Sequence, residues 1–216
     1  MRVRSRVLLA VGTLLSVLIG IGLPAQAAPT VVLSKGHVDV VSPLYQYNQL
    51  RLYVHDESVV PAVDREPSDV LLEALPQSKM TVPADSRYAF LGRPGDPVWV
   101  LPQTQNYSLL FPGLSAEGIS LGVFQGETLT FSLVRVNGPG QFSVYDTDSF
   151  GKPTVLYSTE SPLPQNFVLP VGGHHHANWT FGAAGHYVLT FDVTGTLAGG
   201  KKVSSGPVKF SFQVDA

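Results

Sequence analysis

Turn-forming residues interrupt this chain along its whole length. Glycine (21 residues) and proline (17 residues) are spread through the 216-residue sequence rather than gathered in one linker. Between them lie short runs in which apolar and polar residues alternate, as in TLTFSLVRV over residues 128–136. Alternation with a period of two is typical of half-buried strands. We therefore expect an all-β protein, and an Ig-like β-sandwich is the architecture that this pattern favours.

The expected strands cover most of the chain after residue 36. They are residues 37–41, 49–55, 87–91, 97–101, 119–124, 128–136, 141–145, 178–181, 185–193 and 206–214. The sequence NGPG joins two of these strands and predicts a hairpin between 128–136 and 141–145. We also expect 178–181 to pair with 185–193.

One segment favours a short helix instead of a strand. In SDVLLEAL, residues 68–75, Ser68 can act as an N-cap and Pro76 as a stop signal. The sequence therefore predicts two helical turns here, inside an otherwise β-rich chain.

The first 27 residues have the pattern of a signal peptide. Three arginines precede an apolar run over residues 7–23, and Ala25 and Ala27 form an A-x-A cleavage site. A transmembrane anchor is the alternative, because the run is nearly long enough to span a bilayer. Pro24 and the cleavage site favour removal. We expect a secreted, extracellular product, free or associated with the cell wall, with no further membrane span.

Residues 28–216 are long enough for one domain, with two sub-lobes (28–115 and 116–216) as the alternative. The 14 basic residues, less the three leader arginines, face 16 acidic residues, which gives a net charge of about −5. This balance argues against a nucleic-acid partner. The sequence has no cysteine, so it offers neither disulfides nor thiolate ligands.

Three consecutive histidines begin the segment HHHANWTF, residues 174–181. Read as one strand, the segment places His174 and His176 on one face and His175 and Trp179 on the other. The first face then holds two imidazoles roughly 6 to 7 Å apart, about twice the rise per residue. Two such rings can bind one metal ion if a third ligand comes from elsewhere. The alternative is a polar strand edge that is rich in histidine.

Four segments together resemble one known family. They are SKGHVDV (34–40), YAFLGRPGDPVWVLPQT (88–104), VNGPGQFSVYDTDSFGKPTVLYS (136–158) and HHHANWTFGAAGHYVLTF (174–191). In their order and spacing they are similar to the actinobacterial surface-anchored protein domain of choice-of-anchor M proteins. The resemblance covers nearly all of residues 28–216. It implies a β-rich exported protein associated with an ABC transporter system like those for divalent metals. The anchoring tail of larger members is not seen here, which favours a soluble or wall-associated form.

His37 is a candidate ligand because it lies in the GHVD element and shares a strand face with Asp39. With His174 and His176 it would supply three nitrogens, an arrangement common for zinc, although imidazole also suits copper, nickel and iron. Asp39 is expected to be a fourth ligand or an acceptor for an imidazole N–H. His55 is a reserve ligand.

These observations predict a metal-binding accessory protein, with zinc as the expected ion, linked to an ABC-type metal uptake system. Its expected partner is the transporter's substrate-binding component or a cell-wall component. The alternative is an extracellular adhesion domain that binds a protein or a cell-wall glycan and uses its histidines structurally. An enzyme is not expected, because H-E-x-x-H, G-x-S-x-G and phosphate-loop motifs are all missing. A metal-dependent hydrolase would need an open pocket and a carboxylate beside the site.

Overall fold

The computed structural model describes residues 31–216, and the expected signal peptide lies outside these residues. Strands dominate the described part. Its helices are four short 3-10 segments: η1 (Pro67–Asp69), η2 (Pro76–Ser78), η3 (Ser86–Leu91) and η4 (Gln125–Glu127). No helix within residues 31–216 is long and apolar enough to cross a membrane. The prediction of an all-β sandwich is confirmed.

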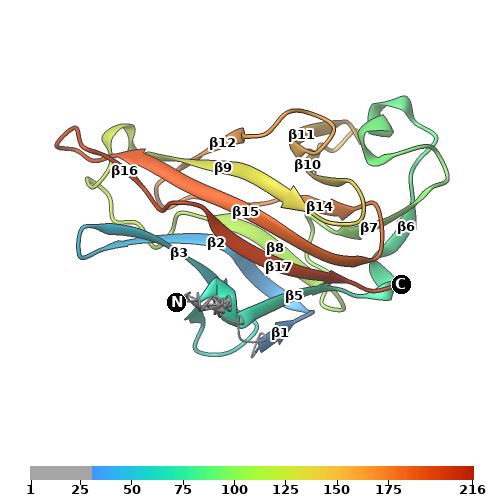
Figure 1. Ribbon diagram of the computed structural model, residues 1–216, viewed down its shortest axis with the longest axis horizontal. Coiled ribbons are helices and arrows are strands. Elements are labelled where there is room, and N and C mark those ends of the chain that lie inside the picture. Colours follow the sequence, from blue (N-terminus) through green and yellow to red (C-terminus); the bar gives the residue numbers. More distant parts are fainter. Residues whose placement is uncertain (1–30) are drawn as a thin grey trace, which may run out of the picture.

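The strands form three sheets (Figure 1). The first has seven strands, in the order β1 (Val31–Leu33), β5 (Val70–Ala74), β17 (Val208–Val214), β15 (Gly185–Thr196), β9 (Thr128–Asn137) and β12 (Gln165–Pro170), with β16 (Lys202–Ser204) beside β15. The second has the order β11 (Pro153–Ser158), β10 (Phe142–Thr147), β14 (Asn178–Phe181), β7 (Pro97–Leu101) and β6 (Lys79–Thr81). The third has the order β13 (His174–His176), β8 (Leu110–Ser115), β2 (Gly36–Gln46), β3 (Gln49–Asp56) and β4 (Val63–Arg65).

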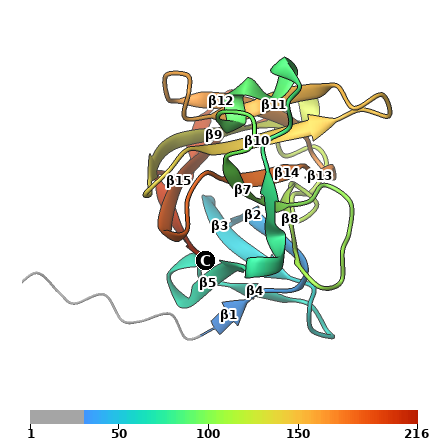
Figure 2. The ribbon, with the colours of Figure 1, turned by 90° about the vertical axis from the view of Figure 1, so that its right-hand side faces the viewer.

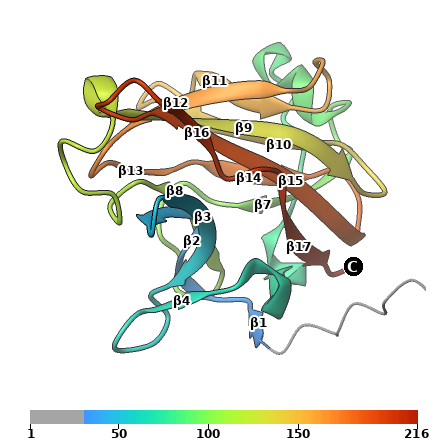
Figure 3. The same cartoon turned by 60° about the vertical axis from the view of Figure 1, so that its left-hand side comes forward.

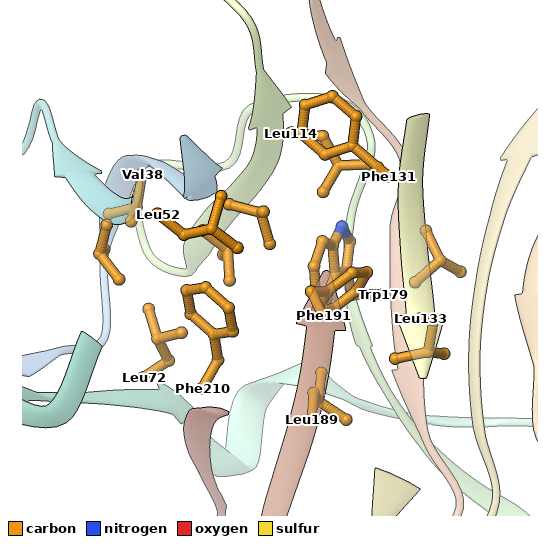
Figure 4. Packing of buried hydrophobic residues seen from close by; sticks show 14 of the residues in the cluster. Val38, Leu52, Leu72, Leu114, Phe131, Leu133, Trp179, Leu189, Phe191 and Phe210 are labelled. Atoms are coloured by element: carbon orange, nitrogen blue, oxygen red, sulfur yellow. The ribbon is translucent and has the colours of Figure 1, made fainter. Parts of the chain in front are cut away.

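The hydrophobic core lies between the first sheet and the other two (Figure 4). Trp179 of the second sheet is fully buried, and its ring centroid lies 6.2 Å from that of Phe191 in the first sheet. Leu52 of the third sheet is buried in the same cluster as Phe210 of the first. Removing so much apolar surface from water is the main stabilising contribution to the fold.

Strands from both sides of residue 115 share this core. The early strand β5 pairs in parallel with the last strand, β17, through a register that joins Leu72 to Phe212. The N-terminal part of the described chain therefore completes the edge of a sheet whose other strands come mainly from the C-terminal half.

Two predicted strand pairings are wrong. β9 and β10 follow one another but lie in different sheets, and so do β14 and β15. Each Gly-rich link carries the chain from one layer of the sandwich to the other instead of folding it back within a sheet. At the second link, the Tyr187 hydroxyl donates to the carbonyl of Ala183 at 3.0 Å and fixes this crossing.

Three local predictions are also wrong. The helix expected over 68–75 is strand β5, because its side chains alternate between buried (Val70, Leu72) and half-buried positions. The strand expected over 87–91 is the 3-10 segment η3, whose start is capped by the Asp85 carboxylate, which accepts from the Arg87 N–H. Residues 119–124 are mainly turn, and Phe124 makes a single bridge to Leu197.

The segment HHHANWTF is not one strand but two. β13 pairs with β8 in the third sheet, whereas β14 pairs with β10 and β7 in the second. The chain changes sheets at Ala177, so Trp179 anchors the second sheet in the core while the histidines stay at the edge of the third. Figure 2 shows β13 and β14 in succession, with β13 beside β8.

Candidate metal centre

Strand β2 supplies His37 and Asp39. It runs parallel to β8, with His37 opposite Phe111 and Asp39 opposite Gly113. The register of β2 shifts just after Asp39 against both of its neighbours, β3 and β8. Such a bulge bends a strand and redirects side chains next to it.

Strand β13 brings the other two histidines to the same place from the opposite side of β8 (Figure 3). His176 lies opposite Gly113, so Asp39, Gly113 and His176 form one row across three strands. A Cβ on Gly113 would lie 2.8 Å from Cε1 of His176 and would collide with the Asp39 carboxylate. The absence of a side chain at Gly113 therefore lets these two residues meet over the strand that separates them.

The four predicted ligands converge. His37, Asp39, His174 and His176 each offer one donor atom, and these atoms lie within 4.8 Å of one another. From Asp39 Oδ1 the distances are 3.6 Å to Nε2 of His37 and 4.0 Å to Nε2 of both His174 and His176. Nε2 of His37 lies 2.8 Å from Nε2 of His176. Neighbouring ligands of a tetrahedral ion are separated by about 3.3 Å, given bonds of about 2.0 to 2.1 Å.

Each histidine is held by its other nitrogen. Nδ1 of His176 lies 2.9 Å from the carbonyl of Pro112, which can only accept, so this Nδ1 carries the hydrogen. Nδ1 of His37 lies 2.9 Å from Glu57 Oε2, and Nδ1 of His174 lies 3.5 Å from Glu117 Oε1. Acceptors at Nδ1 fix the tautomer in which Nε2 presents its lone pair. The three Nε2 atoms, which lie within 4.0 Å of Asp39 Oδ1, thus carry the lone pairs.

Asp39 is the group that this centre leaves unsatisfied. Its side chain is 0 % exposed, and neither carboxylate oxygen has a hydrogen-bond partner. A buried charged group without partners costs several kcal/mol by order of magnitude, unless a cation compensates it. The donor set and this orphaned carboxylate together fit a bound cation.

The pKa values of His37 and His176 are shifted in opposite directions. Attraction to Asp39, only partly offset by burial, raises the pKa of His37 above its ordinary value, and Glu57 adds to this effect. Burial, together with the charges of His37 and His174, lowers the pKa of His176 to about 4. Burial alone would raise the pKa of Asp39, but its three histidine neighbours lower it overall. Without a metal ion, His37 therefore takes up a proton more readily than His176 does.

The site is rigid on its inner side and open on its outer side. The ring of Phe111 stacks on that of His176, with centroids 3.6 Å apart and planes 8° from parallel. His176 is 11 % exposed, whereas His174 is 27 % exposed. An ion could therefore enter or leave on the side of His174.

The remaining histidines lie elsewhere, as predicted for His175. Its Nε2 contacts the Asp146 carboxylate at 3.0 Å, away from the cluster. His55 does not join the four ligands; its Nδ1 contacts Asp64 at 2.7 Å. Asn178 is structural, since its side chain accepts from the backbone N–H of Gln103 and donates to the carbonyl of Tyr145.

Sequence reasoning missed four residues of this centre: Glu57, Glu117, Phe111 and Gly113. The two glutamates follow strands β3 and β8, and only the topology brings them to the histidines. A signal for Gly113 exists in the sequence FPG, residues 111–113, because a glycine within a strand often marks a close approach of backbone or ligand.

The geometry gives this cluster a defined chemical capacity: three neutral imidazoles and one carboxylate could bind a metal ion. Such a nitrogen-rich set suits zinc and the later first-row divalent ions better than magnesium or calcium. A scan against protein-family models, a search of curated proteins and a search of solved structures each find no match to this chain.

Proposed function

We propose that this protein is a secreted or cell-surface protein that binds a divalent transition-metal ion, zinc in the first place, through His37, Asp39, His174 and His176. The proposal rests on how the donor atoms are arranged and on which of them lack a partner. Three Nε2 lone pairs and one buried, unpartnered carboxylate converge, while every Nδ1 is engaged on the outside.

Binding is favoured over catalysis by the number of donors. Four protein ligands fill a tetrahedral ion, whereas a catalytic zinc keeps one position for water or substrate. The nearby carboxylates Glu57 and Glu117 face the Nδ1 atoms of His37 and His174, not the Nε2 atoms that would hold the ion.

We further propose that the ion is cargo for a metal uptake system of the ABC type. The support for this is the resemblance of the four sequence segments, together with the partial exposure of His174, which would permit exchange of the ion. A partner would be the substrate-binding component of the transporter. An adhesion role with structural histidines is the competing proposal.

Metal content tests the proposal. The protein, purified without a histidine tag, is loaded with zinc, desalted and analysed beside His174→Ala/His176→Ala. A matched control is His175→Ala, which removes the neighbouring imidazole that contacts Asp146 instead of the cluster. We expect one equivalent of zinc in the parent and in the control, and an affinity loss of more than about 100-fold in the double variant. Equal zinc in all three proteins, or none in the parent, would overturn the assignment.

A further inference from the structure

A second set of possible ligands shares one residue with the metal centre. Asp39, Glu57 and Glu117 each offer a carboxylate oxygen, and these atoms lie within 4.8 Å of one another. Asp39 forms the buried floor, while the Glu57 and Glu117 side chains are 34 % and 52 % exposed. The set therefore lies between the histidine cluster and solvent.

Each glutamate uses one oxygen for a histidine and keeps another. Oε2 of Glu57 lies 2.9 Å from Nδ1 of His37, whereas its Oε1 lies 3.8 Å from Nε2 of His55, which is beyond hydrogen-bonding distance. Oε1 of Glu117 lies 3.5 Å from Nδ1 of His174. One oxygen of each glutamate thus remains available for a cation.

Asp39 supplies the independent evidence for a ligand here. Its carboxylate is fully buried, and both of its oxygens lack a hydrogen-bond partner. One ion on the histidines satisfies Oδ1, which faces the three Nε2 atoms. Oδ2 of Asp39 would still lack a partner. In addition, a divalent ion on the histidines would offset only two of the three negative charges of Asp39, Glu57 and Glu117.

From this geometry we infer a second cation site, formed by Asp39, Glu57 and Glu117, that takes an oxygen-preferring divalent ion such as Mn²⁺, Mg²⁺ or Ca²⁺. Carboxylates are the ligands these ions prefer, and the site lacks the imidazole nitrogen that favours zinc. Asp39 would be the ligand that the two ions share, because it belongs to both sets of donor atoms. The inference rests on the proposed function, because the inner ion shares Asp39.

Manganese is the probe that distinguishes the two sites. Zinc-loaded protein is titrated with Mn²⁺, and free Mn²⁺ is measured by electron paramagnetic resonance, to which zinc is silent. We expect one Mn²⁺ to bind while zinc stays in place. In Glu57→Gln/Glu117→Gln, Mn²⁺ affinity should fall at least about 10-fold while zinc is retained, because a glutamine oxygen still accepts the N–H of each histidine.

A matched control is Asp64→Asn, which removes a nearby exposed carboxylate that contacts His55 and not the ligand histidines. It should bind both ions as the parent does. Three results would overturn the second site: no Mn²⁺ binding to zinc-loaded protein, equal Mn²⁺ binding in the double glutamine variant, or release of one zinc for each Mn²⁺ bound. A parent that takes up no zinc at all would instead overturn the proposed function.

Discussion

The Nε2 atoms of His37 and His176 face one another at 2.8 Å, although the Nδ1 atoms of both rings already face acceptors. Two neutral imidazoles in this state would direct lone pairs at each other. A separation this short requires a cation or a proton between them. The competition between metal ion and proton therefore decides how this centre behaves.

Zinc affinity should fall with pH earlier than isolated histidines would predict. Attraction to Asp39 raises the pKa of His37 above its ordinary value of 6.5, so this ring takes up a proton at a higher pH than an isolated histidine does. The pKa of His176 is lowered to about 4 by burial, so His176 does not compete for protons in this range. As pH decreases through the pKa of His37, apparent affinity should fall by about tenfold per pH unit.

Competition titrations with a chromophoric chelator at pH values from 6 to 9 would measure this dependence. A midpoint above pH 6.5 agrees with the account. Affinity that is constant down to pH 6 would contradict the assignment of His37 as a ligand.

Asp39→Asn should separate stability from metal binding. At an alkaline pH above the pKa of His37, the metal-free parent buries a carboxylate that has no hydrogen-bond partner. Asparagine removes this charge and can donate to a histidine Nε2, so the metal-free variant should be more stable by about 1 to 3 kcal/mol. Zinc affinity should fall at the same time. Urea unfolding of both metal-free proteins measures the first effect, and lower stability of the variant would count against an unsatisfied Asp39.

Gly113→Ala should damage the centre although it adds only a methyl group. The new Cβ would lie 2.8 Å from Cε1 of His176 and would displace the Asp39 carboxylate. We expect a zinc affinity at least about 10-fold weaker, and destabilisation of about 1 to 3 kcal/mol from overpacking. Gly199→Ala is the control, since nothing lies within 4 Å of its added Cβ. Calorimetric titration of both variants with zinc gives the comparison, and equal affinities would refute the role of Gly113.

Removing the metal should lower the thermal stability of the parent. A ligand that binds only the folded state adds about 4 kcal/mol when its free concentration is about 1,000 times Kd. Differential scanning calorimetry with excess zinc and with a chelator should therefore show a clear shift in Tm. The shift should be lost in His174→Ala/His176→Ala. A shift of the same size in that variant would mean that zinc binds elsewhere.

The sequence predicts which side chains share one face of a strand better than it predicts which strands pair with one another. Alternation placed His174 and His176 on one side and His175 on the other, because the period of a strand is a local property. It could not show that β13 and β14 belong to different sheets, since this depends on which distant strands each one meets. The same limit explains the two wrong pairings across Gly-rich links.

In the candidate site, too, the sequence cannot show which residues long-range strand pairing brings together. His37 was found only through a motif, and no spacing within the chain could place it 2.8 Å from His176, 139 residues away. Glu57 and Glu117 carry no local signal of their role, because an exposed glutamate after a strand is ordinary. Long-range pairing of β2, β8 and β13 makes them neighbours of the ligands.

X-ray absorption at the zinc edge of the loaded protein tests the central claim most directly. We expect three imidazole nitrogens and one oxygen at about 2.0 to 2.1 Å, with the imidazole scattering reduced to a single ring in His174→Ala/His176→Ala. A spectrum with one imidazole or none in the parent, and no change in the variant, would contradict the assignment of His37, Asp39, His174 and His176 as the metal centre.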